Sequence, residues 1–261
     1  MKIHRFIDNF DLSKEELEID GKIAHQIINV LKLKVGEKIE LSDGKHISAI
    51  AHICKIDKKY VLVKIDAPLR LGFAEQDSTK KVNLFCAILK KENFELVVQK
   101  TTECGVSKII PIISSHTIKT GLNLERIEKI AKEASEQSGR NTIPEIIEPT
   151  NFDEGLKLIK KDDLNILFNS SGEYSFQIHA YSPTGELLCS ARQPAQFILK
   201  EHSLDSYKNA QINIWIGPEG GWTPKEIEKA KDLNFKIANL GTLTLRGETA
   251  AIIATYLIKN L

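Results

Sequence analysis

The sequence has almost no excess of charge of either sign. Its 261 residues carry 36 Lys and Arg against 35 Asp and Glu, which gives a formal net charge of +1. A near-neutral chain generates no overall field that would steer it toward a polyanion. Taken alone, the composition therefore argues mildly against a nucleic-acid partner.

Long apolar runs and cysteine motifs are also missing. No stretch of about 18 apolar residues is present, so no transmembrane helix is predicted, and the opening MKIHRFIDNF lacks the apolar core of a signal peptide. The four cysteines are scattered without a C-x-x-C pair, which is typical of free thiols in a reducing cytoplasm. The seven histidines show no metal-ligand spacing. We therefore expect a cytoplasmic protein with no membrane partner and no metal.

What is present is a globular composition, 42% hydrophobic and 27% charged, in a chain long enough for two unequal domains. Short apolar runs separated by turn residues such as Asp43-Gly44 occupy 38–41, 46–53 and 60–65. A period of two with Asp-Gly turns is typical of hairpins, so we expect a small antiparallel β-domain over residues 1–72. One short helix is expected at 22–32, and the polar stretch 69–81 is the expected linker.

Beyond residue 73 the pattern changes. Continuous apolar runs typical of buried parallel strands occupy 82–89, 108–113, 164–168, 212–216 and 235–240. Segments with helical spacing alternate with them at 92–104, 123–138 and 248–260, the second with Asn123 as N-cap and Gly139 as terminator. This alternation predicts an α/β domain with a mainly parallel sheet over 73–261. Residues 169–201 fit the pattern less well, and we interpret them as an excursion from the sheet that contains a hairpin of QIHAYS and ELLCSA.

The sharpest local signal is INIWIGPEGGWTPKEIEKA at residues 212–230. A strand ends at Ile216, a glycine-rich loop follows, and Thr223-Pro224-Lys225-Glu226 has the N-cap, first-turn proline and capping-box glutamate of a helix start. Open α/β sheets bind ligands at such turns, where glycine lets the backbone approach the ligand. The spacing matches neither the dinucleotide fingerprint nor the P-loop. A turn with only a packing role is the alternative.

A second signal is LGTLTLRGETA at residues 240–250. Leu240-Gly241 ends a strand, and Leu245-Arg246 leads through Gly247 into a helix opened by Glu248. A lone Arg beside a Glu is usually a solvated surface charge. The pair becomes a candidate site if this loop lies beside the glycine-rich loop, as two adjacent strand ends would require.

Two further stretches carry polar groups suited to a phosphate backbone. In EASEQSGRN (133–141), Glu133, Gln137 and Arg140 are spaced four and three apart, which predicts one helix face and a bidentate anion contact from Arg140. An exposed polar face is the alternative. Lys100 is a candidate phosphate contact, although a lysine on a helix is most often merely solvated. Near the N-terminus, Phe6 beside Arg5 is a candidate ring for stacking on a base.

Together, in this order, the motifs resemble the RsmE group of the SPOUT superfamily. These enzymes use S-adenosyl-L-methionine to methylate N3 of one uridine in 16S ribosomal RNA. The matching pieces are His4-Arg5-Phe6, HQIINVLKLKVGEKIELSDG (25–44), QKTTECGV (99–106), EASEQSGRN (133–141), IGPEGG (216–221) and LGTLTLRGETA (240–250).

The resemblance implies a fold, a cofactor site and partners. Residues 1–72 would form a PUA-like RNA-binding β-barrel, and residues 73–261 an α/β domain with a trefoil knot that works as a homodimer. S-adenosyl-L-methionine would be surrounded by Ile216, Gly217, Gly220, Gly221, Leu240, Gly241, Leu245 and Arg246. Arg246 would stabilise the uracil anion, and Glu248 would be the candidate base. The 16S RNA, free or in the 30S subunit, would contact Arg5, Lys32, Lys100, Glu133, Gln137 and Arg140.

Two positions depart from the family pattern. Lys32 stands where Arg is common and lacks its bidentate geometry, and Gly247 stands where Thr is usual. Two other functions stay open: a catalytically silent assembly factor with this fold, and a methyltransferase for another RNA such as tRNA. The resemblance also reverses the inference from net charge, because RNA needs only a local basic surface.

Overall fold

The protein was analysed as a computed structural model that describes residues 3–45, 47–66, 70–71, 81–90, 92–118, 120–172, 174–175 and 211–260. The chain forms two compact units. The first comprises Met1–Ser78 and Lys132–Ile143, and the second comprises Thr79–Ala131 and Pro144–Leu261. No described helix is long and apolar enough to cross a membrane. The predicted boundary at residue 72, most of the predicted linker and the predicted QIHAYS–ELLCSA hairpin lie outside the described residues.

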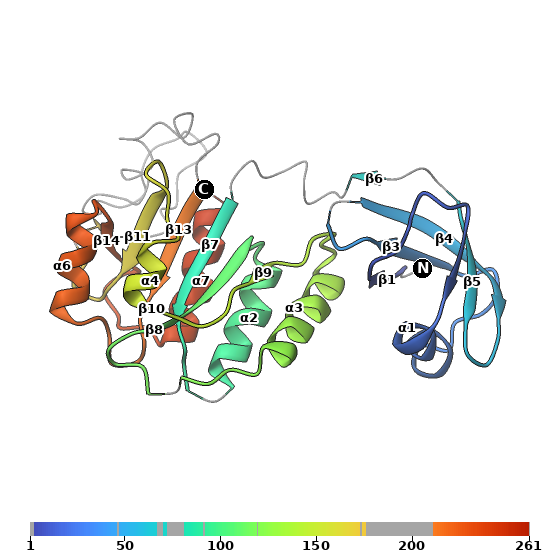
Figure 1. Cartoon of the computed structure of the whole chain (residues 1–261), viewed down its shortest axis with the longest axis horizontal. Helices are drawn as coiled ribbons and strands as arrows, with labels where there is room; N and C mark the ends of the chain where they lie inside the picture. Colours follow the sequence, from blue (N-terminus) through green and yellow to red (C-terminus); the bar gives the residue numbers. More distant parts are fainter. Residues whose placement is uncertain are drawn as a thin grey trace. The chain divides into compact units, whose positions relative to one another are not determined.

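The sheet of the first unit has the order β1-β3-β4-β5-β2 (Figure 1). Its strands are β1 (His4–Ile7), β2 (Glu16–Ile19), β3 (Lys38–Ser42), β4 (Ile47–Ile56) and β5 (Val61–Ile65), with β6 (Arg70–Leu71) paired to β4. The predicted antiparallel pairing holds for β3, β4, β5 and β2. It is wrong for β1, which pairs with β3 in parallel after a long connection that contains β2 and a helical segment.

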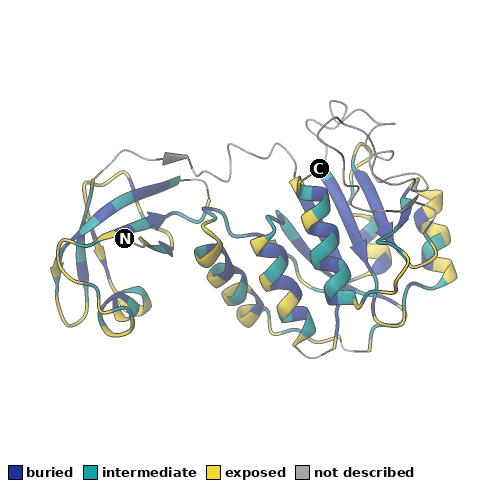
Figure 2. Cartoon of the chain, turned by 180° about the vertical axis from the view of Figure 1, so that it is seen from behind, coloured by how far each residue is buried: buried dark blue, intermediate teal, exposed yellow. Residues whose placement is uncertain are grey.

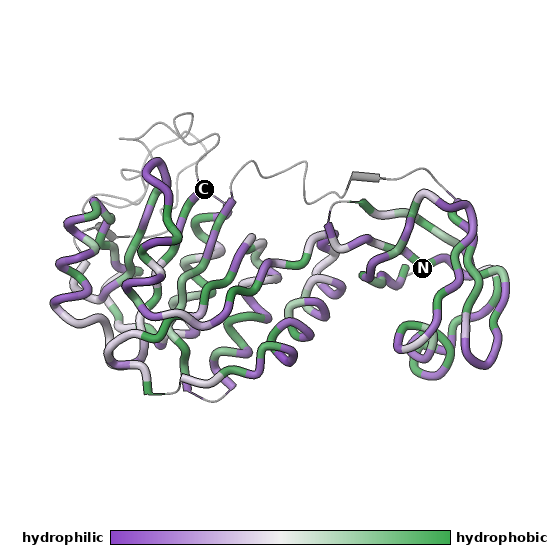
Figure 3. The backbone as a smooth tube through the Cα atoms, viewed as in Figure 1, coloured by the Kyte–Doolittle hydropathy of each residue, from purple (hydrophilic) through white to green (hydrophobic). Residues whose placement is uncertain are grey.

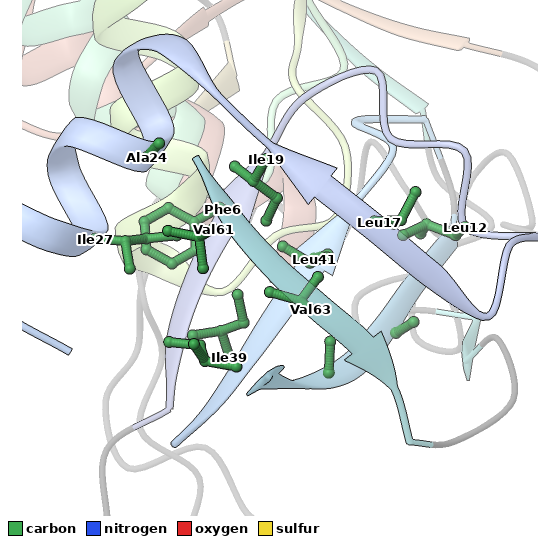
Figure 4. Close-up of a cluster of buried hydrophobic side chains, with 13 residues drawn as sticks. Phe6, Leu12, Leu17, Ile19, Ala24, Ile27, Ile39, Leu41, Val61 and Val63 are labelled. Carbon is green, nitrogen blue, oxygen red and sulfur yellow. The ribbon is translucent and has the colours of Figure 1, made fainter. Parts of the chain in front are cut away.

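The core of the first unit forms from the inward-facing residues of these strands. Ile39 and Leu41 on β3, and Val61 and Val63 on β5, are completely buried, which is the period of two that the sequence shows. Phe6 lies among them, 1% exposed (Figure 4). The expectation that its ring stacks on a base is therefore wrong, because the ring is a core side chain.

The predicted helix at 22–32 is present in two parts. Helix α1 (Gly21–His25) continues into a π-helical turn, η1 (Gln26–Val30), and buries Ala24 and Ile27 against the sheet. The segment ends at Lys32, whose φ of +52° lies in the left-handed region.

Residues 132–143 complete the first unit although they lie far along the chain. The Ile7 N–H donates to Glu136 Oε1 at 3.1 Å, and Ser42 Oγ donates to the Asn141 carbonyl oxygen at 3.0 Å. Asn141 Nδ2 in turn donates to Ser48 Oγ at 3.3 Å. Burial raises the pKa of Glu136, against the effect of the Ile7 hydrogen bond. These contacts join the EASEQSGRN motif to strands β1, β3 and β4.

The described strands of the second unit form a parallel sheet in the order β10-β8-β7-β13-β11-β14-β12, with β9 also paired to β8. The strands are β7 (Lys81–Ala87), β8 (Lys108–Ile113), β9 (Glu145–Ile146), β10 (Thr150–Asn151), β11 (Leu164–Phe168), β12 (Tyr174–Ser175), β13 (Gln211–Ile216) and β14 (Lys236–Asn239). The predicted parallel α/β sheet is confirmed. Strand β13 inserts between β7 and β11, so a late strand occupies the middle of the sheet.

Helices cover both faces of this sheet. Helices α2 (Asn93–Glu103) and α7 (Gly247–Asn260) pack together on one face, and α4 (Phe152–Leu156) lies on the other (Figures 1 and 2). Hydrophobic residues follow the central strands (Figure 3). On β13 the fully buried Trp215 stacks on Phe85 at a centroid distance of 4.1 Å. Helix α6 (Pro224–Asp232) lies beside β14.

Helix α3 (Leu124–Ser138) begins and ends where the sequence predicts. Asn123 Oδ1 accepts the Arg126 N–H at 3.1 Å, which caps the first turn. Gly139 follows the last turn with φ +78°, and the Arg140 N–H donates to the Ser135 carbonyl oxygen at 3.0 Å, the pattern of a Schellman cap. The spacing prediction is therefore wrong for Arg140, which lies past the helix that carries Glu133 and Gln137.

Three buried asparagines form a ladder across the amino ends of neighbouring strands. Asn83, Asn213 and Asn165 face each other in register on β7, β13 and β11. Asn83 Nδ2 donates to Asn213 Oδ1 at 2.8 Å, and Asn213 Nδ2 donates to Asn165 Oδ1 at 2.9 Å and to Asp163 Oδ2 at 3.1 Å. A shift of one residue would break every one of these bonds, so the ladder fixes the register of the central strands.

Candidate active site

A cavity of about 590 Å³ opens at the carboxyl ends of β11, β13 and β14. All eight residues that the motifs predict around a cofactor line it: Ile216, Gly217, Gly220, Gly221, Leu240, Gly241, Leu245 and Arg246. Glu248, at the start of α7, lines it too. The structure thus brings the GPEGG loop and the LRGETA loop to one place, the condition on which the second motif depended.

Two glycines of the glycine-rich loop lie close enough to ring side chains that a larger residue would push on them. A Cβ on Gly217 would lie 3.1 Å from the indole of Trp222, and a Cβ on Gly220 would lie 3.1 Å from Cβ of His116. Trp222 is fixed in turn, because its Nε1–H donates to the Phe168 carbonyl oxygen at the end of β11, at 3.2 Å. The loop is therefore a packed wall of the cavity.

Helix α6 starts immediately after this wall with a complete capping box. The Thr223 hydroxyl accepts the Glu226 N–H, and Glu226 Oε2 accepts the Thr223 N–H at 2.7 Å, as the sequence predicts. Glu226 is 5% exposed. Burial alone would raise its pKa, but hydrogen bonds from Ser115 and Thr223 hold the pKa of this carboxyl below its ordinary value. The helix start is thus anchored by an ionised, buried side chain.

Charged side chains also line the cavity. Arg246 is exposed, whereas Glu248 is 8% exposed and its Oε2 has no hydrogen-bond partner among the described residues. The pKa of the Cys86 thiol is raised, mainly because the thiol is buried and to a smaller extent because the carboxylates of Glu219 and Glu248 lie nearby. Glu219 accepts the Lys90 N–H at 3.1 Å. Two carboxylates and one guanidinium therefore border the cavity.

The departure at Gly247 has a local explanation. A Cβ at this position would lie 2.8 Å from Cδ2 of the fully buried Leu89. Leu89 occupies the space that a threonine side chain would need, so glycine at 247 is matched to its neighbour.

The six residues predicted to contact RNA differ in how far they are buried and in the side chains that they contact. Arg5 Nη2 binds both carboxylate oxygens of Glu40 at 2.7 Å, and its Nη1 lies beside Gly139. Arg140 is half-buried, and burial lowers its pKa to about 10, so it remains protonated at neutral pH. Lys32, Glu133 and Gln137 are exposed. All five belong to the first unit, whereas Lys100 lies on α2 and pairs with Glu103 at 2.8 Å.

Several residues beside the cavity were missed by the sequence analysis. They are Ser115 and His116, which follow β8, and Asn239, which ends β14 and receives the Gly241 N–H at 3.1 Å. Their positions after predicted strands were the available signal, since such positions gather at one edge of a parallel sheet. Among the residues that the structure describes, no group of three or more His, Cys, Asp or Glu could hold a metal ion.

Comparisons with known proteins match two parts of the chain to RNA methyltransferase families. Residues 76–259 match a family model described as an RNA methyltransferase domain, and residues 19–66 match an RNA methyltransferase PUA domain. A ribosomal RNA small subunit methyltransferase E from Rickettsia conorii is 32% identical over 265 residues, covering 100% of this chain and 97% of the relative. The Bacillus subtilis protein of the same name is 25% identical, over 95% of this chain and 94% of its own.

Solved structures agree with these matches. A ribosomal RNA small subunit methyltransferase E from Neisseria gonorrhoeae bound to S-adenosyl methionine superposes with a TM-score of 0.77 at 25% identity, over 99% of this chain and 98% of the other. A putative methyltransferase from Legionella pneumophila in complex with the same cofactor gives 0.76 at 25% identity, over 100% and 98%. The fold and the site thus define a two-domain RNA methyltransferase with a PUA-like β domain. The chain belongs to the ribosomal RNA small subunit methyltransferase E family, which confirms the resemblance seen in its motifs.

Proposed function

We propose that this protein transfers the methyl group of S-adenosyl-L-methionine to N3 of a uridine, uracil 1498, in 16S ribosomal RNA. One observation carries the proposal. Two family motifs that follow different strands, the GPEGG loop after β13 and the LRGETA loop after β14, meet in one cavity at the carboxyl edge of the parallel sheet. Relatives with this fold have been solved with the cofactor bound.

The residues around the cavity suit this cofactor. A volume of about 590 Å³ lies within the range of roughly 300–1,000 Å³ typical of small-molecule sites. Gly217, Gly220, Gly221 and Gly241 line the cavity without side chains, so the backbone of both loops can approach the ligand closely. Ile216, Leu240 and Leu245 supply apolar contacts to the same ligand.

When bound, S-adenosyl-L-methionine supplies a methyl group already activated on a sulfonium. The protein then has to hold the uracil nitrogen in line with that group, which is an effect of proximity. Arg246, exposed at the cavity, stabilises the negative charge on the uracil as N3 loses its proton. Glu248 is the candidate proton acceptor, since its Oε2 is buried without a partner among the described residues.

The first unit supplies the RNA contacts in this proposal. Arg5, Lys32, Glu133, Gln137 and Arg140 offer cationic and hydrogen-bonding groups, and Lys100 adds a cation on the second unit. Lysine at position 32 makes a point-charge phosphate contact where arginine would make a bidentate one. A target uracil must also leave its stack to reach the cavity, at a cost of roughly a few kcal/mol.

We also propose that the protein works as a homodimer in the cytoplasm. Helix α7 carries Tyr256, 56% exposed, with Ile252 and Ile253 half-buried one turn earlier. Leu243, which lines the cavity, is 79% exposed. A second copy packed on α7 would cover these apolar side chains. Light scattering should give twice the chain mass for the wild type and the chain mass for Tyr256→Lys. A monomeric wild type at micromolar concentration would refute the dimer.

The activity test uses 30S subunits purified from a strain that lacks the modification. Incubation with the protein and S-adenosyl-L-methionine should create a primer-extension stop at the target uridine. Glu248→Gln should lower kcat by about 10²-fold or more if it accepts the proton, with cofactor affinity little changed. Lys225→Ala, an exposed change on α6, is the matched control.

Each negative result has a distinct meaning. Absence of both the stop and cofactor binding would refute the proposal. Cofactor and 30S binding without methylation would favour a silent assembly factor, and methylation of tRNA alone would favour another RNA substrate.

A further inference from the structure

The turn that follows β8, Ser114–Thr117, touches the glycine-rich wall without lining the cavity. Two hydrogen bonds join its first and last residues. The Thr117 N–H donates to the Ser114 carbonyl oxygen at 3.0 Å, and the Ser114 N–H donates to Thr117 Oγ1 at 2.9 Å. Ser114 is 5% exposed, so the turn is anchored at the end of a buried strand.

The turn holds the wall at two points. His116 Nδ1 lies 3.1 Å from the Gly220 carbonyl oxygen and 3.0 Å from that of Gly221. Ser115 donates its N–H and its hydroxyl to Glu226 Oε1, at 3.0 and 3.2 Å. One turn therefore fixes both the glycines of the wall and the first turn of α6.

The acceptors define the state of the histidine. Carbonyl oxygens only accept, so Nδ1 must carry the proton. Both the imidazolium and one neutral tautomer carry that proton, so the contact requires no particular charge on the ring. Because a peptide unit is planar, holding a carbonyl oxygen also fixes the orientation of the N–H in the same unit. His116 thus helps to fix two peptide groups in the wall: Gly220–Gly221, whose N–H also donates to the Pro218 carbonyl oxygen at 2.8 Å, and Gly221–Trp222.

We infer that His116 is a positioning residue for the cofactor site: it orients the Gly220 and Gly221 peptides without touching the ligand. This rests on the proposed function, since it assigns the wall to S-adenosyl-L-methionine. A wall free to reorient has to be ordered on binding, which weakens affinity. The effect therefore belongs to cofactor affinity and KM more than to kcat.

The test measures S-adenosyl-L-methionine binding to the full chain by calorimetry. His116→Ala should raise Kd and the cofactor KM about tenfold, with kcat changed by less than about threefold, since one hydrogen-bonded contact is lost. His116→Asn should restore most of the affinity, because asparagine Nδ2 is an N–H donor at nearly the same distance from the backbone as histidine Nδ1. His25→Ala, an exposed histidine of the first unit, is the control.

Two readouts separate positioning from other roles. The ratio of wild-type to His116→Asn cofactor affinity should stay flat from pH 5.5 to 8, whereas a histidine acting as a base would make this ratio change with pH. Thermal melting of each variant without cofactor shows whether the fold is intact. A folded His116→Ala with wild-type Kd, or a folded His116→Asn as weak as His116→Ala, would overturn the inference. A wild type that binds no cofactor would instead refute the proposed function.

Discussion

Replacing Glu226 by glutamine tests how the cavity wall is anchored. The wild-type carboxylate accepts four hydrogen bonds, two from Ser115 at 3.0 and 3.2 Å and two from Thr223 at 2.7 and 2.8 Å. A glutamine keeps one acceptor oxygen, so its NH₂ group faces either Ser115 or Thr223. One backbone N–H is then left without an acceptor, and the remaining bonds lose their charge. At roughly 1–3 kcal/mol for an unsatisfied buried donor, we expect Glu226→Gln to lower the free energy of unfolding by about 3 kcal/mol.

The assay follows tryptophan fluorescence during urea unfolding. Both tryptophans, Trp215 and Trp222, belong to the second unit, so the signal reports on the unit that contains Glu226. Glu228→Gln is the matched control, the same change at an exposed position of the same helix. A loss below about 0.5 kcal/mol, the level of ordinary surface changes, would refute the reasoning.

The same substitution makes a prediction about pH. The folded-state pKa of Glu226 lies below its ordinary value of 4.5. Its contribution to stability is therefore fully present above pH 4.5 and is lost as the pH falls through the lower folded-state pKa. The difference between wild type and Glu226→Gln should be largest near neutral pH and should shrink below pH 4.5. A difference that grows on acidification would contradict the assignment of an ionised carboxylate.

Further predictions concern the core, the cavity and the first unit. Asn213→Leu, which removes the donor to Asn165 Oδ1 and one of the donors to Asp163 Oδ2 in the asparagine ladder, should cost about 2–4 kcal/mol in the same urea assay; a neutral result would show that the ladder contributes no net stability. Gly220→Val should abolish cofactor binding by calorimetry, because its Cβ would press on His116 at 3.1 Å; binding at wild-type affinity would contradict the packed wall. Lys32→Gly should stabilise the first unit by about 0.5–1 kcal/mol in hydrogen exchange by relieving the left-handed φ of +52°, while weakening RNA binding; an unchanged RNA affinity would remove Lys32 from the interface. The buried thiol of Cys86, with its raised pKa, should react with iodoacetamide only on unfolding, and mass spectrometry of the folded protein would detect any exception.

Patterns of burial made most of the fold predictable. A parallel strand covered on both faces is apolar throughout, so runs such as 82–89 and 212–216 identify themselves. Short elements with mixed burial gave no such signal. Strands β9 and β10 have two residues each, and α4 has five, so none repeats a pattern long enough to be seen.

The candidate site was predictable where backbone geometry demands glycine, and unpredictable where a side chain contacts a segment distant in the sequence. The glycines at 217, 220, 221 and 241 follow the ends of predicted strands, where open α/β sheets bind ligands, and all of them line the cavity. His116 was missed because its contacts reach Gly220 and Gly221 more than one hundred residues later in the chain. No local spacing encodes such a pair. Phe6 was predicted to have a function that it does not have. A ring beside an arginine resembles a base-stacking pair, but the strand that carries Phe6 points the ring into the core.

The first unit consists of two separate segments of the chain, which constrains when it can fold during synthesis on the ribosome. Ile7, Ser42 and Ser48 bond to Glu136 and Asn141, which are made roughly a hundred residues later. Domains generally fold from the N-terminus as they emerge, but this one cannot finish until residue 143 has left the exit tunnel. By then strands β7 and β8 of the second unit are already exposed, while their central neighbour β13 is not yet made. The nascent chain therefore spends part of its synthesis with one unit unfinished and, in the other, with the edge of β7 that will bind β13 still unpaired, a period in which chaperone protection matters most.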